Sequence, residues 1–225
     1  MSDFRAVRYR RLALMMVFAL AVYVLVRAAN TPQGHTPPPA GKTVATPTPS
    51  AGSPSASRSS AAPSSYDPAD YASQVRTRAR EAGVSARLVM AILYNEAYKP
   101  HDPALERAWQ KIKPGAAFGI ADMHRATFDE VKKGRDFADR DWTELPDDRD
   151  LAIEAEAWYL HDLAARLPAQ WSAPYTKDEL LALGYDAGPD TMLAFARGAT
   201  PGTDAQAYLD RLHANWAKAK TALGS

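Results

Sequence analysis

Cysteine is absent from the 225 residues of this chain, and neither sign of charge is in excess. The lack of cysteine excludes disulfide bonds, thiolate metal ligands and a cysteine nucleophile, so a folded domain must depend on its hydrophobic core. Lysine and arginine number 27 and aspartate and glutamate 26, which leaves a formal net charge of +1. This balance gives no basis for attraction to a strongly acidic polymer, and we expect no nucleic-acid partner.

The first 29 residues combine a basic start with an apolar run. Four arginines lie within residues 1–11, and the apolar stretch Leu12–Val26 follows them directly. A membrane-spanning helix needs about 20 apolar residues, which this stretch approaches only if Ala28 and Ala29 are included. We interpret residues 1–29 as a single-pass membrane anchor, with a signal peptide cleaved near Arg27 as the alternative. Either interpretation places the rest of the chain outside the cytoplasm, held at the cell membrane or secreted.

Residues 30–65 are rich in proline, serine and threonine. From Thr31 to Ser65 there is no acidic residue, no aromatic residue and a single branched aliphatic residue, Val44. Such a segment buries too little apolar surface to offset the loss of chain entropy, so we predict a disordered linker. Its average reach would be on the order of 30 Å.

Residues 66–225 show apolar residues at helical spacing and no long alternating stretch, which predicts one all-α domain that we expect to be monomeric. Asp67 and Ser85 precede helical patterns and are typical N-caps. The expected helices span about 67–83, 85–97, 122–134, 148–167 and 189–198, with two more that begin at the capping-box positions Thr176 and Thr203.

Glu96 occupies an unusual place in the second of these helices. Leu88 and Ile92 belong to an apolar stripe, and Glu96 continues that stripe four residues beyond Ile92. Burial and the negative end of the helix dipole both disfavour an ionised carboxylate there, which predicts a raised pKa that suits a general acid. The alternative is that Glu96 turns to solvent or pairs with Lys99 or Arg107.

Three segments in order carry a family resemblance. Val84–Glu96 is a helix with glutamate near its end, Gly119–Thr127 begins Gly-Ile-Ala-Asp-Met, and Gly184–Pro189 is Gly-Tyr-Asp-Ala-Gly-Pro. Together they resemble the catalytic helix, the Gly-Leu-Met-Gln segment and the Ala-Tyr-Asn-Ala-Gly motif of soluble lytic transglycosylases and their goose-type lysozyme relatives. The resemblance covers roughly Ala69 to Ala219 and implies a lysozyme-like helical domain.

The resemblance implies cleavage of the β-1,4 bond between N-acetylmuramic acid and N-acetylglucosamine in the glycan strands of peptidoglycan. Glu96 would act first as the acid and then as the base that closes a 1,6-anhydro ring, with Tyr185 hydrogen-bonded to Glu96 or to the substrate N-acetyl group. No metal ion or organic cofactor is implied. The residues expected to line the sugar groove are Tyr94, Phe118, Asp122, Met123 and Asp186, although Tyr94, Phe118 and Met123 also suit core positions.

Departures from the family pattern leave other interpretations open. Ala97 stands where the family has serine, and Asp122 and Asp186 stand where it has amides. If Asp122 lies close to Glu96, repulsion would raise a pKa further, or Asp122 could hold a water and favour a lysozyme-type hydrolysis. The alternatives to an enzyme are an inactive glycan-binding or scaffold module of the cell envelope and a purely structural domain on a stalk.

A metal site is not predicted. His101, Asp102 and His124 do not have the spacing of zinc ligands. The sequence also contains no Gly-x-Ser-x-Gly segment and no glycine-rich phosphate loop.

Overall fold

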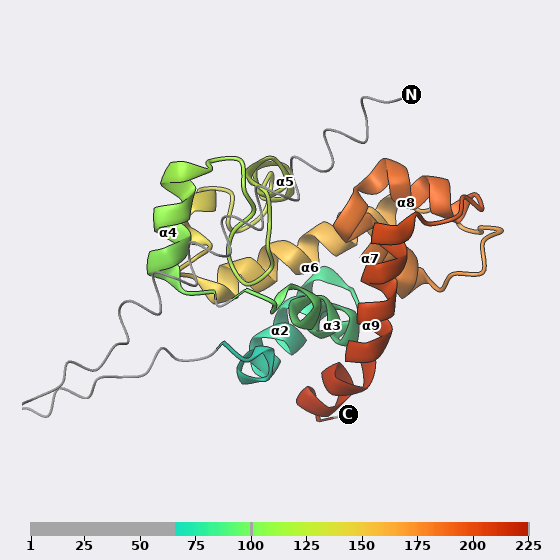
Figure 1. Ribbon diagram of the computed structural model, residues 1–225, viewed down its shortest axis with the longest axis horizontal. Helices are drawn as coiled ribbons and strands as arrows, with labels where there is room; N and C mark the ends of the chain where they lie inside the picture. Colours follow the sequence, from blue (N-terminus) through green and yellow to red (C-terminus); the bar gives the residue numbers. More distant parts are fainter. Residues whose placement is uncertain (1–65, 100, 225) are drawn as a thin grey trace, which may run out of the picture. The chain divides into compact units, whose positions relative to one another are not determined.

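The computed structural model describes residues 66–99 and 101–224, and this part of the chain is all-helical, as predicted (Figure 1). The predicted anchor (1–29) and linker (30–65) lie outside the described residues. Among the residues described, no helix is long and apolar enough to cross a membrane. In chain order the elements are the 3-10 helix η1 (Pro68–Tyr71), α2 (Ala72–Ala82), α3 (Ala86–Glu96), α4 (Pro103–Ile112), α5 (Arg125–Val131), the 3-10 helix η2 (Trp142–Glu144), α6 (Arg149–Arg166), α7 (Lys177–Ala187), α8 (Pro189–Ala196) and α9 (Thr203–Ala222).

Helix α3 is the central element of the core (Figure 1). Every residue from Leu88 to Glu96 is buried, so α3 has no solvent-exposed face over its last nine residues. It packs along α9 and α2 and also contacts α6 and α7. Each fully buried leucine or isoleucine here contributes about 1.5–3 kcal/mol relative to an exposed one. The helix that carries Glu96 is therefore the most completely buried element of the domain.

Several helix starts confirm the expected capping chemistry. The Ser85 hydroxyl accepts a hydrogen bond from the Leu88 N–H at 3.2 Å, which starts α3. Thr176 and Glu179 form the predicted reciprocal capping box of α7. The long predicted helix 148–167 matches α6, whose first turn is capped by Asp148.

Two expected helix boundaries and one expected cap were wrong. The helix expected over 67–83 is divided into η1, which Asp67 caps, and α2. Thr203 is the first residue of α9 and makes no cap hydrogen bond, because Gly202 takes the N-cap position in an extended conformation. The helix expected from Asp122 to Gly134 is the shorter α5, since Asp122 has a positive φ of 46° and cannot begin a helix.

A tight turn replaces the expected start of that helix. Phe118 and Met123 exchange backbone hydrogen bonds of 3.1 and 3.0 Å, which closes the chain between them into a loop. Gly119 has a φ of +73°, and a Cβ at this position would lie 2.9 Å from the Leu145 carbonyl oxygen. Only glycine satisfies both conditions. The turn fixes the backbone position of Asp122, whose side chain is only 16% exposed.

We expect Gly119→Ala to destabilise the domain, because the left-handed backbone and the close approach to Leu145 both exclude a methyl group. The expected loss in free energy of unfolding is about 2 kcal/mol or more, measured by urea titration. Gly115→Ala is the matched control, because a Cβ there meets nothing within 4 Å. Equal unfolding midpoints for the two variants would contradict this account of the turn.

Candidate functional site

Glu96 is the last residue of α3 and is only 8% exposed. Its Oε1 accepts a hydrogen bond from the Tyr208 hydroxyl of α9 at 3.1 Å. Burial is the largest cause that raises the pKa of Glu96, to about 7, and repulsion from Asp122 adds to it. The Tyr208 hydrogen bond and the Lys99 ammonium act in the opposite direction. A carboxyl group with this pKa exists in both protonation states near neutral pH, as general acid-base chemistry requires.

Glu96 neither turns to solvent nor forms an ion pair with Lys99 or Arg107. The side chain does not turn to solvent, because it is buried. Lys99 pairs with Asp122, and Arg107 pairs with Asp147. Lys99 affects Glu96 only as a nearby positive charge that lowers its pKa.

Two further acids surround Glu96. Asp122, at the corner of the Phe118–Met123 turn, also accepts a hydrogen bond from the Tyr98 hydroxyl at 3.3 Å. Asp186, near the end of α7, has a pKa raised by burial and lowered by the Arg211 guanidinium. Both acids raise the pKa of Glu96. Asp122 is therefore close enough to Glu96 for the repulsion that the sequence analysis considered. Glu96, Asp122 and Asp186 thus interact although they come from three separate segments.

Tyr185 does not make the expected hydrogen bond to Glu96. Its hydroxyl donates to the carbonyl oxygen of Ala121 at 2.5 Å and so joins α7 to the turn that carries Asp122. Tyr208 is the tyrosine that binds the Glu96 carboxyl group. The expected alternative, a hydrogen bond from Tyr185 to the substrate N-acetyl group, stays a prediction.

Phe118 and Met123, which were expected to line a groove, are core residues with exposures of 2% and 3%. The Phe118 ring packs edge-on against Trp142, with 5.0 Å between ring centroids. The Trp142 indole N–H donates to the Met123 carbonyl oxygen at 2.8 Å. Tyr94 is also largely buried, and its hydroxyl lies 3.5 Å from Asp67. Phe118 and Met123 support the turn from inside.

Glu156 of α6 is a site residue that the sequence analysis missed. It is fully buried, and neither carboxyl oxygen has a hydrogen-bond partner among the residues that the structure describes. Burial, with a further contribution from Glu96, raises its pKa well above the usual value. Both effects favour the protonated form of Glu156 over the charged form. The signal that identified Glu96 was also present here, because Glu156 continues the apolar stripe of Ala152 and Ile153.

A polar network holds the end of α3. The buried His101 ring places Nε2 3.1 Å from the Glu96 carbonyl oxygen and Nδ1 2.9 Å from Glu106 Oε1. Glu106 Oε2 accepts the Gly119 N–H at 2.8 Å. His101 and Glu106 thus connect the backbone of the proposed acid to the turn that carries Asp122. Asp102, which was considered with His101 as a metal ligand, instead caps α4 by accepting the Leu105 N–H.

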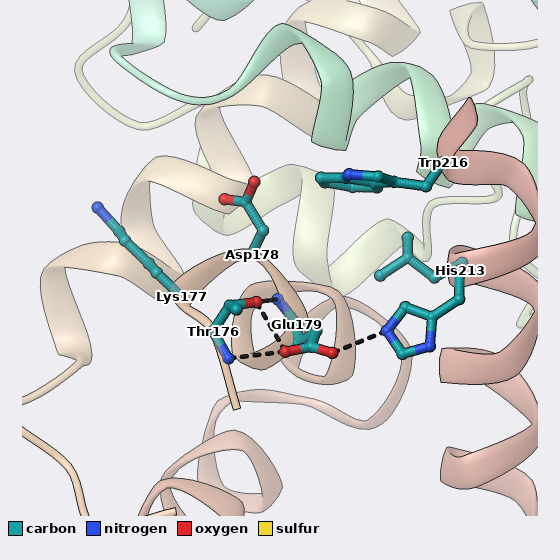
Figure 2. Close-up of a pocket in the computed structure, with 7 residues that line it drawn as sticks. Thr176, Lys177, Asp178, Glu179, His213 and Trp216 are labelled. Atoms are coloured by element: carbon teal, nitrogen blue, oxygen red, sulfur yellow. Dashed lines mark hydrogen bonds and ion pairs between the residues drawn. The ribbon is translucent and has the colours of Figure 1, made fainter. Parts of the chain in front are cut away.

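The hollow shown in Figure 2 lies between the start of α7 and α9 and has a volume of about 510 Å³. The Glu179 carboxylate lies between Thr176 and His213, with 2.7 Å from Oε1 to His213 Nε2 (Figure 2). Trp216 forms one wall of the hollow. The Arg87 guanidinium lies 4.6 Å from the centroid of its ring. None of the residues expected to form the site lines this hollow.

Comparisons of the chain with protein-family models, curated proteins and solved structures find no match.

We expect Tyr208→Phe to raise the pKa of Glu96 above about 7, because the lost hydrogen bond favours the ionised carboxylate. The pKa is measured by carbon-13 NMR titration of the glutamate side chains. Tyr159→Phe is the control, since the Tyr159 hydroxyl lies 3.5 Å from the Gly184 carbonyl oxygen and not at Glu96. An unchanged or lowered pKa in Tyr208→Phe would show that this hydrogen bond does not act on the carboxylate.

We expect the free energy of unfolding to fall as the pH rises from about 5 to about 8. Burial raises the pKa values of Glu96 and Glu156, so both groups hold a proton more tightly in the folded chain than in the unfolded one. Their stabilisation is fully present below the unfolded pKa of about 4.3 and is lost as the pH rises through each folded pKa.

Glu156→Gln replaces the protonated carboxyl with a neutral amide and should make this fall shallower by up to about 1.4 kcal/mol per pH unit. Urea unfolding at the two pH values measures the difference. Glu130→Gln is the control, because Glu130 is exposed on α5. The same pH dependence in Glu156→Gln and in the unaltered chain would mean that Glu156 does not hold a proton in the fold.

Proposed function

We propose that the chain is a peptidoglycan lytic transglycosylase with a lysozyme-like helical domain. The observation that carries the proposal is the Glu96 carboxyl group, whose pKa is raised to about 7 at the end of a buried helix. The three motif segments support it, because the turn at Asp122 and the end of α7 at Asp186 both lie within electrostatic reach of Glu96. The substrate would be the glycan strands of the cell wall, reached from a membrane anchor or after secretion.

In the first proposed step, protonated Glu96 donates its proton to the oxygen that bridges N-acetylmuramic acid and N-acetylglucosamine. The bond between this oxygen and C1 of the muramoyl residue breaks, and its electron pair stays with the oxygen. The acetamido oxygen of the same sugar supports the positive charge at C1. The Tyr208 hydroxyl, at 3.1 Å from Oε1, stabilises the Glu96 carboxylate that results.

In the second proposed step, the Glu96 carboxylate removes the proton from the muramoyl O6 hydroxyl. O6 then bonds to C1 and closes the 1,6-anhydro ring, which returns Glu96 to its protonated form. A pKa near 7 serves both steps, because the group must give a proton and then take one back. Neither step uses a metal ion or an organic cofactor.

A second candidate is a glycan-binding or scaffold module without turnover. The ion pair of Asp122 with Lys99 and its hydrogen bond from Tyr98 favour this candidate, because they engage the acid that contributes most to the repulsion on Glu96. Ala97 favours it as well, since a hydroxyl is missing beside the acid. Hydrolysis by a water held at Asp122 is a variant of the enzymatic proposal and yields a different product.

The test is digestion of purified peptidoglycan by the full chain, followed by mass spectrometry of the released fragments. We expect 1,6-anhydro products, which are about 18 Da lighter than hydrolysed ends because no water is added. Glu96→Gln keeps the shape of the side chain and removes the acid, so the rate should fall about 10²- to 10⁴-fold.

Glu130→Gln, at an exposed glutamate, is the matched control and should digest at the unaltered rate. Products with ordinary reducing ends would replace the proposal with a lysozyme-type hydrolysis. Absence of any product that depends on Glu96 from a folded chain, across several types of peptidoglycan, would favour the binding module.

A further inference from the structure

A polar cavity of about 420 Å³ adjoins the C-terminal end of α3. Asn95 and Ala97, the sequence neighbours of Glu96, line it, although Glu96 itself does not. Tyr98 also lines it, and its hydroxyl donates to Asp122, which raises the pKa of Glu96. The opposite wall comes from α9, which contributes Arg211 and Lys218. These two residues are seven positions apart, which places them on the same face of the helix two turns apart.

The cavity presents more positive than negative charge. Among the residues that the structure describes, neither Arg211 nor Lys218 has a carboxylate within 4.0 Å, and both are exposed. Asp67, the acid that lines the cavity, accepts hydrogen bonds from the Ala69 N–H and the Tyr94 hydroxyl as the cap of η1. The Arg211 guanidinium partly offsets the burial that raises the pKa of Asp186, but Asp186 does not line the cavity.

Aromatic rings complete the cavity walls. The Lys218 ammonium lies 3.9 Å from the centroid of the Tyr94 ring, so its charge is held over an aromatic face at the cavity wall. Tyr98 contributes a second ring and is 71% exposed. The Asn95 amide is bound to the Tyr208 carbonyl and to Asn215, which leaves it unavailable to a ligand. A ligand therefore meets two cations and apolar ring surface.

We propose that this cavity binds a carboxylate of the substrate beside the bond that is cleaved. The assignment rests on the proposed function: in peptidoglycan, the carboxylates belong to the peptide stem carried by the muramoyl residue. The stem also supplies small apolar groups that pack on tyrosine rings. Because the chain has a net charge of only +1, its attraction for an anionic polymer depends on local pairs of cations such as this one. Phosphate groups of anionic wall polymers share the same chemistry and are separated by the test.

The first experiment compares three substrates with the full chain: soluble glycan strands with stems, the same strands after an amidase has removed the stems, and stem-bearing strands freed of phosphate polymers. For Lys218→Gln, we expect the ratio of KM on stem-bearing strands to KM on stripped strands to rise about fivefold, with kcat unchanged. Lys220→Gln is the matched control, because Lys220 lies on the same helix and does not line the cavity. It should leave the ratio as it is.

An equal change on both substrates, or no change on either, overturns the proposal. A change that disappears when phosphate polymers are removed also overturns it, because the site would then bind phosphate. Arg211→Gln provides a second variant, and it should raise the same ratio.

The second experiment does not depend on activity. N-acetylmuramoyl-L-alanyl-D-glutamate and its neutral diamide are titrated into Glu96→Gln while amide chemical shifts are recorded. We expect chemical-shift changes around Tyr94 and Lys218 with the dicarboxylate only. They should disappear in the double variant Glu96→Gln/Lys218→Gln and persist in Glu96→Gln/Lys220→Gln. If the chain cleaves no strand but these shifts occur, the proposed function fails and the anion site stands. If the chain cleaves strands and the shifts are absent, the proposed function stands and the anion site fails.

Discussion

A carboxyl group loses solvation when it is buried, and the cost falls only if the group is protonated or hydrogen-bonded. Helix α3 imposes this constraint, because it is buried on all sides from Leu88 to Glu96 and ends in the carboxyl group. The surrounding elements meet the constraint in part: Tyr208 donates one hydrogen bond, and Lys99 supplies a positive charge. The compensation is incomplete, since the pKa of Glu96 still rises to about 7. A fully satisfied carboxylate would stay ionised and could not act as an acid.

The same constraint explains why the turn before α5 is joined so firmly to α3. His101 binds the Glu96 carbonyl oxygen, and Glu106 connects His101 to the Gly119 N–H. From the other side, the Tyr185 hydroxyl binds the Ala121 carbonyl oxygen within the same turn. The position of Asp122 relative to Glu96 is thus set by contacts on both sides of the turn. These contacts, together with the Lys99 ion pair of Asp122, oppose the repulsion between the two acids.

Local signals in the sequence predicted much of the fold. Ser85, Thr176 and the pattern of α6 predicted helices correctly, because capping and periodicity depend on neighbouring residues. Helix α4 was missed, although Asp102-Pro103 is the same cap signal as Asp67-Pro68. The site was less predictable. The position of Glu96 followed from its stripe, but its bond to Tyr208 joins residues 112 positions apart, and no local rule relates them.

The pairing of Glu96 with Glu156 shows what decides which carboxyl group ionises. Both are buried, and the charge on Glu96 further raises the pKa of Glu156. Glu96 has a hydrogen-bond donor, a nearby cation and contact with the surface, whereas Glu156 has none of these among the described residues. The first proton therefore leaves from Glu96, and Glu156 remains neutral behind it. Had Glu156 ionised first, its charge would have opposed formation of the Glu96 carboxylate, which the second proposed step requires as a base.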